Sequence, residues 1–247
     1  MDHLVYVAAS GAREAMLAQA LNTHNLANAS TAGFRGDLIS ATSAYVNGSA
    51  AGATRVFAGM HNTGVDFSHG TINATGRNLD VAVNGEGWIA VADAQGGEAL
   101  TRRGDLRVDE FGQLINGAGR QVLGESGPIA LPPYSEIMLG ADGTVSIVPL
   151  GEKPDSTAVV DRIKLVNPDN AGLAKGKDGL IRMLDGEELV ADAGVRLIPG
   201  SIEASNVDTV GSMVQMIELS RQFENHTRMM KVAEQLDQSS AELMKLS

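Results

Sequence analysis

Apolar positions near the start of the chain recur at the spacing of a helix. Between Leu4 and Ala27, small and aliphatic residues return every three or four positions, with polar residues between them. This period predicts an amphipathic helix over that range. Small residues bury little area each but let helices approach closely, so we expect this helix to need partners. The stripe consists of Leu4, Ala8, Gly11, Ala15 and Ala18.

A second helical pattern occupies the end of the chain. The stretch from Val207 to Leu246 has no proline and no glycine after Gly211, which predicts one helix roughly 55–60 Å long. Two sets of apolar residues repeat every seven positions, one position apart, and indicate a heptad seam with a shift in register. The sets are Met216, Phe223 and Met230, then Met229, Leu236 and Leu243.

The start of this second helix carries capping signals. Ser205 and Asn206 are predicted N-caps, and Asp208 stands in the expected first turn, where the helix dipole favours an acid.

Between the helices the pattern changes to short apolar or alternating runs bounded by Gly, Asn and Asp. Such runs predict β-strands. Asp142-Gly143 and Asn116-Gly117 supply the chemistry of tight hairpin turns. The predicted strands are Leu79–Val83, Trp88–Ala92, Leu106–Val108, Gln121–Leu123, Ile137–Leu139, Val145–Val148, Arg162–Val166 and Val195–Ile198.

These patterns predict an α+β fold, with a mainly-β middle domain and terminal helices that pair as a coiled-coil-like inner domain. We expect residues 1–35 and 200–247 to form the helical inner domain and 76–199 a β-rich outer domain. Residues 36–75 are expected to be an extended connecting segment, with a hairpin as an option.

Composition argues against several classes of site and partner. The chain of 247 residues has no cysteine, which excludes thiolate metal sites and disulfides. Its formal net charge of -11, with no concentrated basic face in the sequence, argues against nucleic acid as a partner. The apolar runs are too short to predict membrane insertion, and the start of the chain lacks the pattern of a cleaved signal peptide.

Three local motifs hint at chemistry and are weighed against simpler interpretations. Gly85–Ala90 fits the dinucleotide pattern G-x-G-x-x-A, but alternation after Trp88 predicts a strand and a hairpin turn rather than the required helix. Gly124–Gly127, around Ser126, resembles a shortened nucleophile elbow and is expected to be a turn, since Pro128 follows.

The third motif is the set His61, Asp66 and His69, whose spacing matches no known metal-ligand pattern. A Met-rich helix could also bind peptides, although its seven-residue spacing favours a helix seam. We therefore predict no catalytic, cofactor-binding or metal-binding residues. An enzyme would instead need titratable groups gathered in one cleft, and a secreted β protein or adhesin would have dispensable ends.

Specific motifs resemble the flagellar rod and hook family over essentially the whole chain. Residues 25–35 read NLANASTAGFR, similar to the family signature N-L-A-N-x-S-T-x-G-[FY]-[KR]. Gly200–Val207 and the run from Met213 to Glu224 match a second motif, and Arg77–Trp88, Thr101–Gly104 and Ala141–Val145 resemble the family's β domain. The opening Met1–Tyr6 resembles proximal-rod more than distal-rod subunits.

The resemblance implies a structural, non-enzymatic subunit of the proximal rod of the flagellar basal body. Such a subunit assembles helically, lines the export channel and transmits torque. A distal-rod or hook-type axial subunit is the alternative. The implied partners are copies of the chain, other proximal-rod subunits, the distal-rod protein FlgG and the flagellar type III export apparatus. The implied location is the rod across the periplasm, reached without signal cleavage.

The seams and motifs together give a predicted assembly interface on both terminal segments. It comprises Leu4, Ala8, Gly11, Ala15, Ala18, Asn25, Leu26, Asn28, Gly33, Phe34, Val207, Val210, Met213, Met216, Ile217, Phe223, Met230, Leu236 and Leu243.

Overall fold

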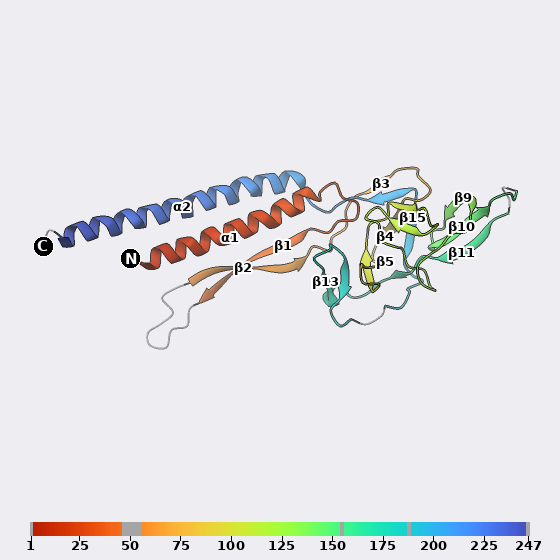
Figure 1. Ribbon diagram of the computed structural model, residues 1–247, viewed down its shortest axis with the longest axis horizontal. Coiled ribbons are helices and arrows are strands. Elements are labelled where there is room, and N and C mark those ends of the chain that lie inside the picture. Colours follow the sequence, from red (N-terminus) through yellow and green to blue (C-terminus); the bar gives the residue numbers. More distant parts are fainter. Residues whose placement is uncertain (1, 46–55, 154–155, 187–188, 246–247) are drawn as a thin grey trace. The chain divides into compact units, whose positions relative to one another are not determined.

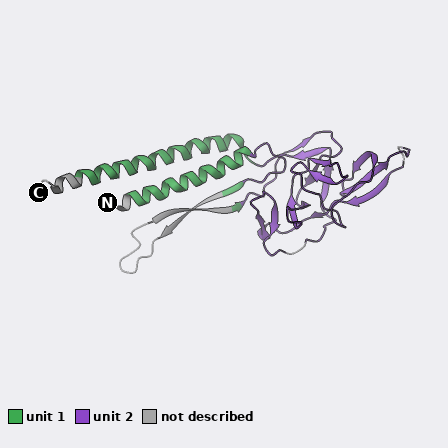
Figure 2. Ribbon diagram, in the orientation of Figure 1, with its two compact units in different colours: residues 1–27, 37–64, 207–247 green, residues 28–36, 65–206 purple. Residues whose placement is uncertain are grey.

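The computed structural model describes residues 2–45, 56–153, 156–186 and 189–245, and within these the side chains of 2–4, 39–63 and 240–245 lie outside the description. The chain divides into two compact units (Figure 2). Unit 1 contains residues 1–27, 37–64 and 207–247, and unit 2 contains 28–36 and 65–206.

Unit 1 is built on two long helices that lie side by side, α1 (Asp2–Ala27) and α2 (Thr209–Lys245) (Figure 1). They run antiparallel, because Asn22 near the end of α1 donates a 2.7 Å hydrogen bond to the carbonyl of Ser212 near the start of α2. The connecting stretch contributes a two-stranded sheet of β1 (Asp37–Tyr45) and β2 (Val56–Val65).

The end of α1 at Ala27 agrees with the sequence prediction. Beyond it the chain turns, with the Thr31 amide donating to the Asn28 carbonyl at 3.0 Å. Gly33 then adopts a φ of +66°, in the left-handed region that favours glycine.

The start of α2 differs from the prediction. The helix begins at Thr209, and Asp208 is the residue that caps it, since its carboxylate accepts a 3.0 Å hydrogen bond from the Val210 amide. The predicted N-caps Ser205 and Asn206 were wrong. The Asn206 side chain is instead used in bonds within unit 2, including one to the Gly36 amide at 2.8 Å.

Unit 2 is made of short strands and one 3-10 turn. Its elements are β3 (Ile72–Ala74), β4 (Val81–Asn84), β5 (Trp88–Ala92), β6 (Glu98–Thr101), β7 (Leu106–Val108), β8 (Leu114–Asn116), β9 (Tyr134–Leu139), β10 (Thr144–Pro149), β11 (Ala158–Arg162), β12 (Leu165–Val166), η1 (Asn170–Gly172), β13 (Leu173–Lys175), β14 (Ile181–Met183), β15 (Arg196–Pro199) and β16 (Ser201–Glu203).

The largest sheet has the order β12-β5-β6-β14-β13, and a second sheet has the order β11-β10-β9. Three strand pairs, β15-β4, β16-β3 and β7-β8, complete the unit. All the ladders with a recorded register are antiparallel. The partners of β4 and β3 come from near the end of unit 2, so distant parts of the sequence close the same core.

Several predicted strands and turns are confirmed. Trp88–Ala92 and Leu106–Val108 coincide with β5 and β7. Asp142-Gly143 lies in the turn between β9 and β10, which pair antiparallel, and Gly143 has a φ of +88°.

Three strand or turn predictions need correction. Gln121–Leu123 makes only isolated bridges, and the predicted strand Arg162–Val166 is divided between β11 and β12. The division follows from a change of partner, because Ile163 bridges Gly124 while Leu165 pairs with Ile89 of β5. Gly85–Gly87 is a turn but not a hairpin, since β4 and β5 pair in different sheets.

The core of unit 2 is aliphatic and closed. Ile89, Leu106, Leu114 and Val145 are all completely buried within one cluster that joins several sheets. A smaller cluster packs around Trp88, where Phe67 meets the indole ring edge-on at 5.9 Å between ring centroids.

Candidate assembly interface

The contact between the two helices of unit 1 follows one unbroken heptad seam on α2. Its positions alternate in steps of four and three, and all are partly or fully buried, whereas most of the residues between them are exposed. Leu219 and Ala233 are 6% and 1% exposed. The seam consists of Ser212, Met216, Leu219, Phe223, His226, Met230, Ala233 and Asp237.

Small residues of α1 face this seam. Ala8, Ala12, Ala15 and Ala18 are buried. At Gly11 the helices approach so closely that a Cβ atom would lie 2.4 Å from the Cε1 atom of His226. Glycine at this position therefore permits the observed spacing of the helices, as the small-residue stripe suggests.

The predicted shift of register in the α2 seam was wrong. Met216, Phe223 and Met230 lie on the seam, but Met229 and Leu236 lie beside it and are exposed. The seam continues without a shift because some of its positions are polar, such as His226. A search for apolar residues alone does not recognise these positions as part of the seam. Leu4 and Leu243 lie outside the residues whose side chains are described.

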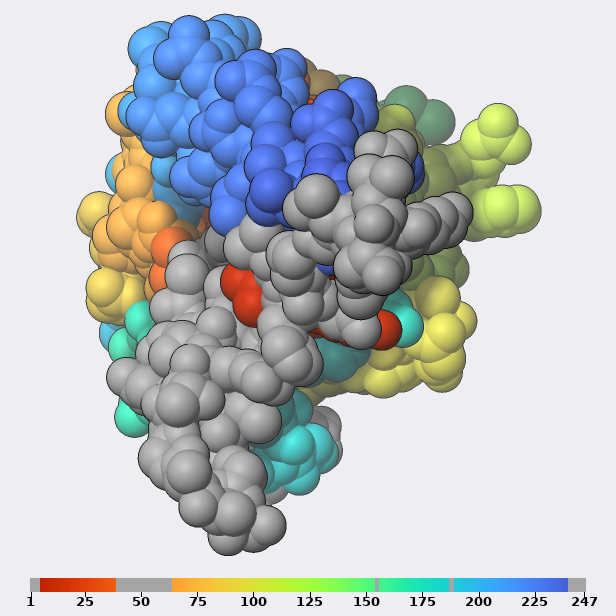
Figure 3. Space-filling model, turned by 90° about the vertical axis from the view of Figure 1, so that its left-hand side faces the viewer, coloured from red at the N-terminus to blue at the C-terminus, as the bar shows by residue number. Residues whose placement is uncertain are grey.

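A second apolar face of α2 remains uncovered. Near the start of the helix, Val210 is 71% exposed and Ile217 is 56% exposed, and Met213 and Val214 beside them are also exposed. Further along, Met229, Val232 and Leu236 form another exposed group. In the space-filling view, atoms of α2 (blue) lie at the surface (Figure 3). Soluble monomers rarely leave apolar groups of this kind uncovered on one element.

Helix α1 also exposes large apolar side chains away from its alanine stripe. Tyr6, Val7, Met16 and Leu17 are all exposed. Sequence analysis missed these four residues, as well as Val214 and Val232. For the two α2 residues the signal was present, because Val214 lies at helical spacing from Val210 and Ile217, and Val232 from Met229 and Leu236.

The predicted interface residues near the end of α1 make contacts inside the chain. The Asn25 side chain both donates to and accepts from the backbone of Asp37, at 2.9 Å in each case. The Gly33 amide donates to the Glu203 carbonyl at 2.8 Å. The Nζ atom of Lys175 lies 4.1 Å from the centre of the Phe34 ring. Leu26, Asn28 and Val207 are half-buried.

The two glycine-containing motifs that were considered as a nucleotide site and as a nucleophile elbow both form turns in the structure. Gly87 is followed by strand β5 rather than a helix, so the turn does not present a helix N-terminus to a phosphate. Ser126 lies in a turn closed by a 2.7 Å hydrogen bond from the Gly124 amide to the Gly127 carbonyl.

Asp66 and His69, two of the three residues considered and rejected as metal ligands, have other partners. Asp66 accepts from the Ser68 amide at 2.9 Å, and His69 lies 3.1 Å from a carboxylate oxygen of Glu86. His61 lies outside the described side chains. Among the described residues, no three His, Asp or Glu side chains are placed together to hold a metal ion.

The most perturbed titratable groups of unit 2 form an ion-pair network. Hydrogen bonding to Arg182 lowers the pKa of Asp178 to about 2, and the same pair raises the pKa of Arg182. Arg182 also bonds Asp93 at 3.1 Å, which lowers the pKa of that carboxylate. Arg182 on strand β14 thus pairs with two ionised carboxylates, a structural arrangement rather than a poised acid and base.

The longest helices are not membrane spans. Within the described residues, neither α1 nor α2 combines the length and the apolar content that crossing a bilayer requires.

Comparison with known proteins places these features in a family. Residues 198–243 match the family described as flagellar basal body rod FlgEFG protein C-terminal, and residues 82–147 match the flagellar hook protein FlgE/F/G D1 domain. The first match covers most of α2, and the second covers strands β5 to β9 of unit 2.

Relatives match over the whole length. The flagellar basal-body rod protein FlgF of Salmonella typhimurium (strain LT2) is 37% identical, with 100% of both chains covered. FlgF of Escherichia coli K12 is 39% identical over 97% of this chain and 96% of its own length. The rod protein FlgG of Bacillus subtilis is 32% identical over 89% of this chain and 90% of its own. The chain therefore belongs to the FlgE, FlgF and FlgG family of flagellar rod and hook proteins, and it is a structural subunit of the basal-body rod rather than an enzyme.

Proposed function

We propose that the chain is a proximal-rod subunit in which the two terminal helices form the assembly domain. The observation that supports this most strongly is the uncovered apolar face of α2. Helix α2 packs on α1 through its buried seam. Val210, Met213 and Ile217 lie outside that seam, so the fold of the single chain does not bury them. Covering such side chains on assembly stabilises by about 1.5–3 kcal/mol each.

In this proposal the chain has three functional parts. Residues 1–35 with 200–247 form the coiled-coil-like inner domain, 36–75 connect, and 76–199 form the outer β domain, with 28–35 and 200–206 packed within unit 2 beside the β domain. The inner domains of many subunits line the export channel, and the assembled rod transmits torque. The 3-4 spacing of the α2 seam against small α1 residues supports the coiled-coil-like pairing.

The proposed partners are further copies of the chain, other proximal-rod subunits and FlgG. All would share the terminal helices, so one apolar face can meet similar faces on different subunits. Methionine is common on α2, and its flexible side chain suits neighbours that are not identical. The proposed route is the flagellar type III export apparatus, without signal cleavage, into a rod that spans the periplasm.

A distal-rod role is the alternative, since a FlgG relative also matches along most of the chain. The higher identity to the FlgF relatives favours the proximal position. Complementation separates the two: the chain should restore motility to a strain that lacks FlgF and fail in one that lacks FlgG.

The interface itself is tested by Ile217→Asp. An unpaired charge buried among apolar side chains is costly, so this variant should be exported and folded but absent from purified basal bodies, and cells should be non-motile. Val190→Asp is the matched control, because Val190 is an exposed valine of unit 2 at 86% exposure. Normal incorporation of Ile217→Asp would contradict the proposal.

A further inference from the structure

The chain passes between its two units at four places, and unit 2 holds all four connections through a few side chains. The crossings follow residues 27, 36, 64 and 206. In unit 2, three segments adjoin these crossings. Residues 28–36 have a crossing at each end, a second segment starts at residue 65, and a third ends at Asn206.

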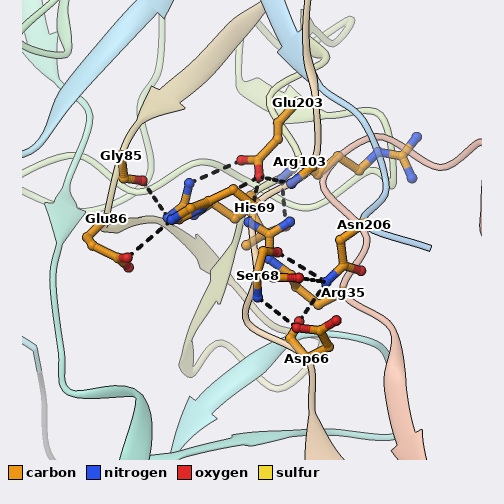
Figure 4. Close-up of polar contacts among 12 residues, drawn as sticks. Arg35, Asp66, Ser68, His69, Gly85, Glu86, Arg103, Glu203 and Asn206 are labelled. Carbon is orange, nitrogen blue, oxygen red and sulfur yellow. Dashed lines mark hydrogen bonds and ion pairs between the residues drawn. The ribbon is translucent and has the colours of Figure 1, made fainter. Parts of the chain in front are cut away.

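Asn206 joins these three segments directly. Its Oδ1 atom accepts a 2.8 Å hydrogen bond from the Gly36 amide, and its Nδ2 atom donates to the carbonyls of Asp66 and Ser68 at 2.8 and 3.1 Å. The backbone adds two bonds, from the Asp66 amide to the Gly36 carbonyl at 2.8 Å and from the Asn206 amide to the Phe34 carbonyl at 3.3 Å. In Figure 4, dashed lines lead from the Asn206 side chain to Ser68 and to Asp66.

Glu203, three residues before Asn206 in the sequence, joins the same segments. Its carboxylate accepts hydrogen bonds from Arg35 at 2.6 Å, from Arg102 at 3.1 Å and from the Gly70 amide at 3.0 Å (Figure 4). The Glu203 carbonyl accepts from the Gly33 amide at 2.8 Å. The side chains of both arginines are 2% exposed and that of Glu203 is 1% exposed.

The β body anchors this group of charges. Arg102 donates to the carbonyl of Gly85 at 2.7 Å. The guanidinium carbons of Arg35 and Arg102 lie 5.8 and 5.3 Å from the centre of the Trp88 ring, at the distance of cation-π contacts. Strand β5 and the residues after β6 thus hold the segments that lead to the crossings.

The composition of the group argues for positioning rather than for stability alone. Two buried guanidiniums share one carboxylate, and the Nε atoms of both have no hydrogen-bond partner among the described residues. Burial lowers the pKa of Arg102, an effect that the Glu203 charge opposes and the Arg35 charge reinforces. Apolar side chains of similar volume often stabilise a core as well or better, whereas directional bonds fix a geometry.

We propose that Glu203 and Asn206 form a clamp that fixes the four chain crossings on unit 2 as a single joint. The family-motif residues Arg35, Glu203 and Asn206 then act within one subunit. Loss of the clamp frees the connecting segments while both units stay folded.

The first test is Asn206→Ala in the full chain, followed by hydrogen exchange at individual amides. The amides of residues 36, 66 and 206 should exchange about tenfold faster. The Gly36 amide loses its acceptor, and the backbone bonds of the other two amides are no longer held in place by the Asn206 side chain. Amides of β5, β6 and β10 should keep their protection. Unchanged exchange at the crossings would overturn the clamp, and so would equally faster exchange throughout unit 2.

Asn206→Asp is a size-matched second variant. It keeps the acceptor for the Gly36 amide but loses the donor to the carbonyls of Asp66 and Ser68. Exchange at Asp66 and Ser68 should rise more than exchange at Gly36, and the reverse order would overturn the assignment of these bonds.

Asn116→Ala is the matched control. Asn116 is a buried asparagine of unit 2 whose side chain accepts from the amides of Ala118 and Arg120 in a local turn. Its loss should speed exchange in that turn and leave the crossings as they are. Faster exchange at the crossings in this control would show that they respond to any loss of stability in unit 2, and would overturn the clamp.

Discussion

The two units use apolar residues in opposite ways. Unit 2 encloses a large aliphatic core, in which Leu106 and Leu114 have no exposed surface, while its exposed apolar residues, such as Leu150 and Val190, come from separate segments. Unit 1 buries mainly alanines and a single seam, and leaves Val210 and Ile217 more than half exposed. The core residues of unit 2 are thus buried by its own fold, whereas the exposed apolar residues of α2 lie at helical spacing and remain available for another chain.

This difference explains how one chain serves both as a folded body and as a building block. A closed core is stable in a lone subunit. A helix pair held by small residues gains little from its own contact, so a large share of its stabilisation is left for assembly. Unit 2 should therefore behave like an ordinary domain, and unit 1 should depend on neighbours.

The largest expected effect is in the core of unit 2. Leu114→Ala should destabilise that unit by about 2–5 kcal/mol, because it removes a fully buried side chain and leaves a cavity. Trp88 is the single tryptophan and lies in unit 2, so its fluorescence reports unfolding of that unit, while circular dichroism at the helix band reports α1 and α2. Equal shifts of both signals would mean that the two units unfold together, which would contradict the view that unit 2 is stable independently of unit 1.

A smaller effect is expected in the seam of unit 1. Gly11→Leu must push α1 away from His226, at a cost of about 1–3 kcal/mol for an overpacked contact. The helix signal should melt at lower temperature with Trp88 fluorescence unchanged. Ala20→Leu, on an exposed position of the same helix, is the control and should leave the helix signal in place. A wild-type helix transition in Gly11→Leu would show that the close approach is not required.

The smallest effect concerns a surface ion pair of unit 2. Arg182 lowers the folded-state pKa of Asp178 from 3.8 to about 2, so the pair contributes stability above the unfolded pKa. That contribution is lost as pH falls through 3.8 toward 2. Because the pair is partly exposed, its worth is no more than about 1 kcal/mol. Urea midpoints from Trp88 fluorescence should therefore fall less steeply over this pH range in Asp178→Asn. A slope equal to that of the unchanged chain would rule out the contribution.

Local signals in the sequence predict much of this structure. The end of α1, strand β5 and the Asp142-Gly143 turn each depend on a few neighbouring residues, and each was found as predicted. Strand pairing was less accessible. Val81 to Asn84 pair with residues 196–199, more than a hundred positions away, and nothing local marks that partner.

The packing face of α2 was also only partly predictable from local sequence. Hydrophobicity alone places Met229 and Leu236 in a seam, but the face that packs on α1 includes Ser212 and His226, because small α1 residues accommodate them there. Similarly, Ser205 and Asn206 were predicted to cap α2, with Asp208 in its first turn. Tertiary hydrogen bonds engage Asn206, which leaves the cap to Asp208.

The measurement that tests the assembly face most directly is thiol accessibility. The chain has no cysteine, so Val214→Cys carries one unique probe on the exposed face of α2, and Val190→Cys carries one on unit 2. Both should react with a maleimide in the isolated subunit. In purified basal bodies the cysteine at 214 should be protected, and its reaction should be slower relative to the isolated subunit than that of the cysteine at 190. If the cysteine at 214 reacts in basal bodies as fast as in the free subunit, the apolar face of α2 is not the assembly surface.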